Sequence, residues 1–176
     1  MADIIPQDST PEEVLIAMGR IAMRWAMVED GIDALTILSF RWLGGKFALA
    51  PAPLPRAFRR KIQYLRRAYQ TLPALSSWRE DALLLLGRTV PLGLQRHRHL
   101  HAVGTPDPAN RKVGFIKWAY REENFYTERF SAHVDQLNEL ADQIHGLAAD
   151  WLILAHSAFR ARFPDYFEKA DREVAG

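Results

Sequence analysis

The stretch that decides the fold is residues 14–42, VLIAMGRIAMRWAMVEDGIDALTILSFRW. Large apolar side chains recur along it at intervals that are mostly three or four positions: Val14, Met18, Ile21, Trp25, Val28, Ile32, Leu35 and Trp42. This spacing places them on one stripe of an α-helix, as in a helix that packs on a core along one face. The pattern predicts one long helix over residues 10–43.

Both ends of this helix carry their own signals. Thr10-Pro11-Glu12-Glu13 combines an N-cap threonine, a proline at the first helical position and a glutamate three residues after the cap, which together form a capping box. Gly44-Gly45 ends the helix, because glycine readily adopts the left-handed conformation that follows a helix.

Two further helices are predicted in the middle of the chain. Alternating prolines favour an extended loop over residues 46–55, followed by a second helix over 56–70. Ser77-Trp78-Arg79-Glu80 has the pattern of another capping box and predicts the start of a third helix at Ser77. The inner face of this helix is predicted to consist of Leu83, Leu86, Val90 and Leu94, with a kink at Pro91 and Gly93.

A change of period follows the third helix. Residues 104–110 are rich in glycine and proline and predict a loop. Apolar side chains then alternate between Lys112 and Phe130, which predicts a short β-hairpin. A last long helix is predicted over 132–162, and the charged tail 165–176 is expected to be flexible, as is the segment 1–9.

The fold class is therefore mostly all-α, an antiparallel four-helix bundle with a short β-hairpin inserted before the last long helix. All of it is expected to form a single domain over residues 1–176. Three tryptophans, Trp25, Trp118 and Trp151, are expected in its core.

Composition narrows the function classes. The chain of 176 residues is 48% apolar and 25% charged, as in ordinary globular domains. It has no cysteine, which excludes disulfides, thiolate metal sites and a cysteine nucleophile. A glycine-rich phosphate loop, an HExxH pattern and a nucleophile elbow are also missing, which argues against nucleotide-dependent enzymes, zinc peptidases and serine hydrolases.

Hydropathy argues against a membrane protein. The first residues, MADIIPQDSTPEE, have neither a basic nor an apolar signal-peptide region. The longest apolar run, Ala82 to Gly87, is far below the roughly 20 residues that span a bilayer. We expect a cytoplasmic protein without a membrane partner.

The segment Arg96-His97-Arg98-His99-Leu100-His101 is the strongest candidate for chemistry. His97 and His101 are four residues apart and share one face of the third helix. They continue the stripe of Val90 and Leu94, so they are expected to point toward the bundle or a partner surface.

The order of Arg96, a polar residue, three further residues and His101 resembles the signature of the HEPN superfamily. The layout is similar too, with Trp25 and Glu29 in a long first helix and Lys61 in the second. The resemblance implies a compact helical bundle that forms a homodimer, in which the motifs of two protomers face each other and cleave RNA without a metal or cofactor. It also implies a toxin or phage-defence role, with a cognate antitoxin as a partner. His97 replaces the asparagine that is commoner in the family.

The chemistry of these residues suits that activity. Histidine titrates near neutral pH and serves as an acid or a base, and arginine matches phosphate with two parallel donors. We expect His101 to be the acid or base, Arg96 the phosphate clamp, and His97 an orienting group.

The second helix is strongly basic, with no acid among its arginines and lysine. Tyr64 lies between Arg60 and Arg67 on one face, and an aromatic ring within positive charge suits single-stranded RNA. The residues expected to bind RNA are therefore Arg60, Lys61, Tyr64, Arg67 and Arg98.

Plainer interpretations stay open for each feature. His97 and His101 are equally compatible with interface or core histidines, or with a zinc site completed by acids elsewhere. The basic helix is compatible with a solvated face paired with neighbouring acids. The alternatives to an RNase are a non-catalytic HEPN-like interaction or nucleotide-binding module, and a helical-bundle protein that binds a metal or small ligand.

Overall fold

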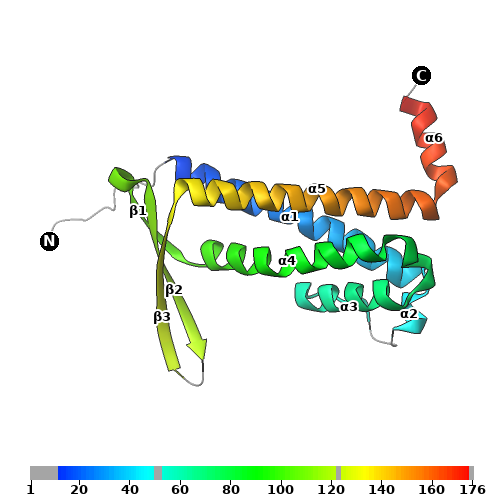
Figure 1. Ribbon diagram of the computed structural model, residues 1–176, viewed down its shortest axis with the longest axis horizontal. Coiled ribbons are helices and arrows are strands. Elements are labelled where there is room, and N and C mark those ends of the chain that lie inside the picture. Colours follow the sequence, from blue (N-terminus) through cyan, green and yellow to red (C-terminus); the bar gives the residue numbers. More distant parts are fainter. Residues whose placement is uncertain (1–11, 50–52, 122–123, 175–176) are drawn as a thin grey trace. The chain divides into compact units, whose positions relative to one another are not determined.

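The fold is known from a computed structural model that describes residues 12–49, 53–121 and 124–174 (Figure 1). Within them lie six α-helices, two short 3-10 helices and three strands. In chain order these are α1 (Glu12–Trp42), α2 (Gly45–Ala48), α3 (Phe58–Thr71), η1 (Pro73–Trp78), α4 (Arg79–Leu100), β1 (Val103–Asp107), η2 (Pro108–Asn110), β2 (Lys112–Arg121), β3 (Asn124–His133), α5 (Val134–Arg162) and α6 (Pro164–Val174). No helix in the described ranges is both long and apolar enough to cross a membrane.

The chain divides into two compact units. The first comprises residues 1–24 and 91–145, and the second comprises residues 25–90 and 146–176. The helices α1, α4 and α5 contribute residues to both units. The single domain expected from the sequence stays a prediction.

The long amphipathic helices were predicted well. The helix predicted over 10–43 is α1, and the helix predicted over 132–162 is α5. Their buried side chains recur at helical spacing, as in Val28, Ile32 and Leu35 of α1. The N-terminal capping box and the segment 1–9 lie outside the described residues, except for the two glutamates that open α1.

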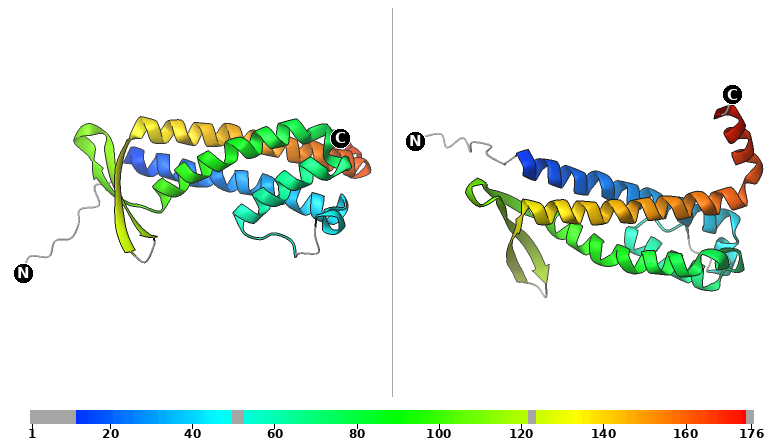
Figure 2. Two further views of the ribbon diagram at one scale, coloured as in Figure 1. Left: turned by 60° about the horizontal axis from the view of Figure 1, so that its bottom comes forward. Right: turned by 45° about the horizontal axis from the view of Figure 1, so that its top comes forward.

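The antiparallel four-helix bundle is not confirmed. Within the second unit, α3 lies beside the later part of α1, where Phe58 contacts Trp25, Lys61 pairs with Asp33, and Tyr64 contacts Phe40 (Figure 2). The contact positions advance in the same direction along both helices, so α3 runs broadly parallel to α1. A short connection would have given antiparallel neighbours instead.

The inner face of α4 was predicted correctly at Leu86 but wrongly in the second half of the helix. Val90 and Leu94 are exposed, whereas the buried positions are Ala82, Leu85, Leu86, Thr89 and Leu92. The helix starts at Arg79, because residues 73–78, including the expected cap Ser77, form the 3-10 helix η1. Pro91 lies inside α4, which continues through it to Leu100.

The predicted hairpin is confirmed, and it belongs to a three-stranded antiparallel sheet in the order β1-β2-β3. Phe115 of β2 faces Phe130 of β3, and Val113 faces Ala132. The predicted loop over 104–110 was wrong, since β1 pairs with β2 from Val103 opposite Ile116 to Asp107 opposite Lys112. A proline is tolerated in β1 because this strand lies at the edge of the sheet.

The segment expected to be a flexible tail contains the helix α6, whose first residue Pro164 suits the first turn of a helix, and its flexibility stays a prediction. Trp118, expected in the core, is 69% exposed on the hairpin, whereas Trp25 and Trp151 are buried.

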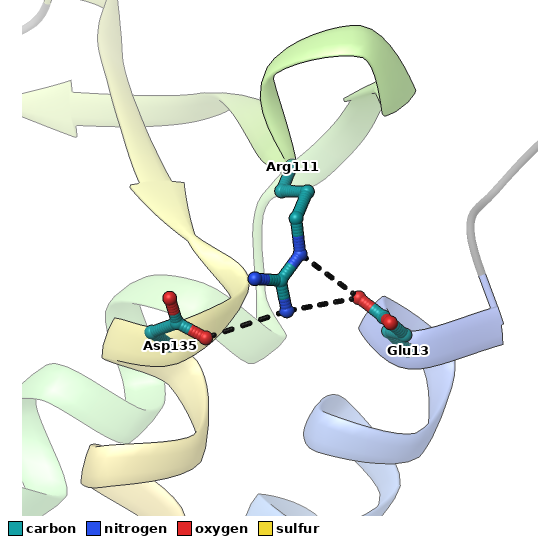
Figure 3. Close-up of polar contacts among 3 residues, drawn as sticks. All are labelled: Glu13, Arg111 and Asp135. Carbon is teal, nitrogen blue, oxygen red and sulfur yellow. Dashed lines mark hydrogen bonds and ion pairs between the residues drawn. The ribbon is translucent and has the colours of Figure 1, made fainter.

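In the first unit, Arg111 joins three segments (Figure 3). Its guanidinium Nη2 lies 3.2 Å from Glu13 Oε2 at the start of α1 and 3.4 Å from Asp135 Oδ1 at the start of α5. Its carbonyl accepts a hydrogen bond from the Val134 amide. Both acids lie in the first turns of their helices, where negative charge is favourable, so Arg111 sets the turn that leads into β2.

Tyr69 of α3 is fully buried in the second unit, and no described group is hydrogen-bonded to its hydroxyl. Burial raises the pKa of Tyr69 above the ordinary value of 10.0. The folded state therefore resists loss of this proton more than the unfolded state does. The corresponding stability is fully present below pH 10 and is lost as the pH rises above that value.

We therefore expect Tyr69→Phe to keep the protein folded at higher pH than the wild type, with neutral-pH stability equal or up to about 1 kcal/mol higher because an unpaired buried hydroxyl is removed. Urea denaturation followed by circular dichroism at neutral and at alkaline pH would measure both effects. A variant that is clearly less stable at neutral pH would contradict the unpaired hydroxyl.

Candidate functional site

The candidate site lies at the C-terminal end of α4, in the first unit. Leu92 anchors this end of the helix, and Arg96 and His99 are half-buried on the same side. The sheet follows directly from the helix through β1. The last turn of α4 is thus held by its inner side, while its outer side presents side chains to solvent.

His97 and His101 lie together on that outer side. Both are exposed, and their ring centroids are 4.4 Å apart with an interplanar angle of 45°. The expectation that they point into the bundle is therefore wrong. Their direction toward a partner surface stays a prediction.

Positive groups lie near His97. Partial desolvation of this ring lowers the pKa of His97 below 6.5, and the charges of Lys117, His101 and Arg96 lower it further. The imidazole of His97 is consequently held in its neutral form at neutral pH, in which one ring nitrogen can accept a proton. Lys117 comes from β2, so both the helix and the sheet contribute to the site.

The two neighbouring residues of the motif have structural contacts. His99 lies edge-on to the stacked rings of Phe115 and Phe130, at centroid distances of 5.3 and 5.5 Å, and its Nδ1 is 2.8 Å from the carbonyl oxygen of Gln95. Burial lowers the pKa of His99. This histidine is therefore a neutral packing residue that joins α4 to the sheet.

Arg98, expected to bind RNA, also joins α4 to the sheet. Its guanidinium carbon lies 4.1 Å from the centre of the Phe130 ring, and its Nη2 is 2.7 Å from Glu128 Oε1. The ion pair offsets the charge of this guanidinium, and the ring contact fixes its plane. These contacts give Arg98 a role in fixing the last turn of α4 against β3.

The other residues expected to bind RNA belong to α3 in the second unit. Arg60 and Arg67 are exposed, but Lys61 pairs with Asp33 of α1. Tyr64 is half-buried between Phe40 and the backbone around Gly45, which leaves its ring poorly placed to stack on a base. Of the residues of α3 expected to bind RNA, the arginines are therefore exposed, whereas Lys61 and Tyr64 are engaged in contacts within the protein.

A metal site finds no support in the described part of the chain. No group of three or more histidine, aspartate or glutamate side chains there could hold a metal ion. The pair of imidazoles alone would supply two of the four ligands of a tetrahedral zinc site.

Lys117 was missed in the sequence. Its position in an alternating segment indicated a strand but did not reveal which helix that strand would approach. Its chemistry suits the site, because an ammonium near the imidazole of His97 favours an anion. Two histidines, a lysine and an arginine provide acid, base and phosphate-binding groups without a metal.

Comparison with known proteins found no family model, no curated protein and no solved structure that matches this chain.

Proposed function

We propose that this chain is an HEPN-like ribonuclease that cleaves RNA without a metal, at the end of α4. The observation that carries the proposal is the exposed pair His97 and His101, with ring centroids 4.4 Å apart beside Arg96 and Lys117. Proton transfer and phosphate binding are both served by side chains of this one cluster.

The proposed reaction is attack by the RNA's own 2′-hydroxyl. His97 takes the 2′-hydroxyl proton, and the 2′-oxygen forms a bond to phosphorus. The bond from phosphorus to the 5′-oxygen breaks, and His101 gives that oxygen a proton. The products are a 2′,3′-cyclic phosphate and a 5′-hydroxyl, and the two histidines have exchanged their protonation states.

The roles differ from those expected from sequence. The lowered pKa of His97 favours it as the base, with His101 as the acid. Arg96 and Lys117 would neutralise the charge that builds on the phosphate oxygens. Because the pKa of the base is lowered, we expect the acidic limb of the pH–rate profile to lie below pH 6.5.

The resemblance to HEPN proteins adds a homodimer to this proposal. The exposure of both imidazoles on the outer side of α4 leaves them accessible to a second protomer and to RNA. A cytoplasmic toxin or defence protein with a cognate antitoxin is the biological setting that this resemblance favours.

The test is cleavage of a mixed RNA pool by the purified chain in EDTA. We expect the wild type to produce cyclic-phosphate ends, and His97→Ala and His101→Ala each to lower the rate by at least about a hundredfold, which is the usual contribution of one acid or base. His145→Ala is the matched control, since His145 is an exposed histidine of α5 in the same unit.

Three results would contradict the proposal. Cleavage that both histidine variants retain would place the activity elsewhere. Activity that appears only with an added metal would exclude this mechanism. RNA binding by the wild type with no cleavage of any RNA in the pool would favour the non-catalytic binding module.

A further inference from the structure

Apart from Thr71 at its last position, the exposed residues of α3 are all arginine or glutamine. At about 100° of rotation per residue, six positions share an arc of roughly 120°. All six are exposed: Arg59, Arg60, Gln63, Arg66, Arg67 and Gln70. We call this set the arginine face.

The arginines of this face have no acidic partners among the residues that the structure describes. Within the described ranges, none of them lies within ion-pairing distance of a carboxylate, whereas the neighbouring Lys61 pairs with Asp33. An ordinary solvated helix face mixes both signs of charge and gains a little from such pairs. Here four positive charges lie together, and no carboxylate in the described part of the chain is paired with them.

The start of α3 increases this imbalance. Its first turn contains Arg59, Arg60 and Lys61 and no acid, and the N-cap residue Ala57 provides no side-chain hydrogen bond. Cations are unfavourable at the positive end of a helix dipole, where acids are normally found. The positive charges at the start of α3 therefore come with a small loss of helix stability.

The side chains of the arginine face indicate which kind of partner it can bind. Four apolar side chains of α3, Ile62, Leu65, Ala68 and Tyr69, are buried, and Phe58 is half-buried against Trp25. The arginine face itself therefore offers nothing apolar to insert into a bilayer. Guanidinium groups match phosphates with paired donors, and glutamine amides suit the sugar and phosphate oxygens of a nucleic acid. The two arginine pairs are seven residues apart, about 10 Å along the helix, or roughly three nucleotides of helical rise in one strand.

We propose that the arginine face binds the phosphate backbone of a nucleic acid, without reading its sequence. This proposal concerns the second unit and does not depend on cleavage at the end of α4. The proposed site also differs from the RNA-binding site expected from the sequence. It includes Arg59 and Arg66, and it does not involve the stacking of a base on Tyr64.

The test is fluorescence anisotropy of the full chain with a labelled DNA oligonucleotide, single-stranded and then duplex, across a range of salt concentrations. DNA lacks the 2′-hydroxyl, so the proposed cleavage cannot consume the probe. For Arg66→Gln/Arg67→Gln we expect a dissociation constant higher on the order of tenfold at low salt. The slope of log affinity against log salt should fall by about 0.7 per lost charge on a single strand.

Two further variants make the result specific. Arg59→Glu/Arg60→Glu places acids where the helix dipole favours them, so its loss of binding cannot come from unfolding of α3. Arg20→Gln/Arg41→Gln removes the same charge from exposed positions of α1 and should leave the affinity almost unchanged.

His145→Ala, at an exposed histidine of α5 that belongs to neither proposed site, should bind as tightly as the wild type, whether or not the cleavage proposal holds. Equal binding by the wild type and the Arg66→Gln/Arg67→Gln variant would overturn the inference. So would binding to phosphatidylserine vesicles with none to either DNA probe, because that result would assign the face to a membrane.

Discussion

Replacement of Trp151 by alanine is expected to lower the free energy of unfolding by about 3–5 kcal/mol, the usual cost of emptying a large aromatic site in a core. Trp151 of α5 is fully buried in the second unit. A Cβ atom on Gly31 of α1 would lie 2.9 Å from the Trp151 Cβ, so the two helix backbones approach closely at this residue. Such tight neighbours cannot collapse readily into the space that the indole leaves, which increases the loss.

The polar contact of the indole can be tested separately. Trp151 Nε1 donates to Thr89 Oγ1 at 2.9 Å, and the Thr89 hydroxyl donates to the Leu85 carbonyl. Thr89→Val keeps the shape but leaves the buried indole N–H unpaired, which should cost about 1–3 kcal/mol. The loss in free energy of unfolding for Trp151→Phe should lie between the losses for Thr89→Val and Trp151→Ala. Urea denaturation measures all three, and an alanine variant within about 1 kcal/mol of the wild type would show that Trp151 is not central to this core.

The contact between Trp151 and Thr89 also explains why the buried face of α4 could not be predicted. The buried stripe of α4 includes the polar Thr89, and the predicted stripe used the apolar Val90 and Leu94, which are exposed. A buried threonine is acceptable because both of its hydrogen bonds are satisfied inside the protein. Nothing in the local sequence shows that a tryptophan 62 positions away provides the second of them.

The sequence predicts best where a single pattern persists. Continuous apolar periodicity correctly predicted α1, α5 and the hairpin of β2 and β3, because one buried face controls each of these elements. It failed for β1, whose residues Val103–Asp107 include a glycine and a proline. That strand forms because β2 offers it a free edge, which is a property of the sheet and not of the segment itself.

The candidate site was predicted in part for the same reason. The spacing of His97 and His101 correctly placed them on one side of a helix, since local geometry decides this. Lys117 joins them only through the approach of β2 to α4, and Arg98 and His99 are occupied by contacts with β3. Local spacing therefore revealed the histidine pair, whereas the tertiary fold determines which neighbouring charges act on it.

Replacement of Gly45 by alanine is expected to cost about 3 kcal/mol of stability, the upper part of the range for forcing an atom into a packed site. An alanine Cβ at this position would lie 2.1 Å from the Tyr64 hydroxyl and 2.7 Å from the Ser39 carbonyl oxygen. The tyrosine could move its hydroxyl, but Ser39 belongs to the backbone of α1 and cannot move without distorting the helix. The chain must therefore keep glycine where it turns from α1 into α2.

The adjacent glycine provides the control. Gly44 has a φ angle of 81°, and a Cβ atom there would meet nothing within 4 Å. Gly44→Ala should therefore cost only the strain of a left-handed alanine, about 1–2 kcal/mol. Tyr64→Phe combined with Gly45→Ala removes the hydroxyl contact but leaves the contact with Ser39, so it should recover part of the loss. Equal stability of Gly44→Ala and Gly45→Ala in urea denaturation would contradict this argument, because it would mean that strain at the turn, and not the close approach of Gly45 to Ser39 and Tyr64, requires both glycines.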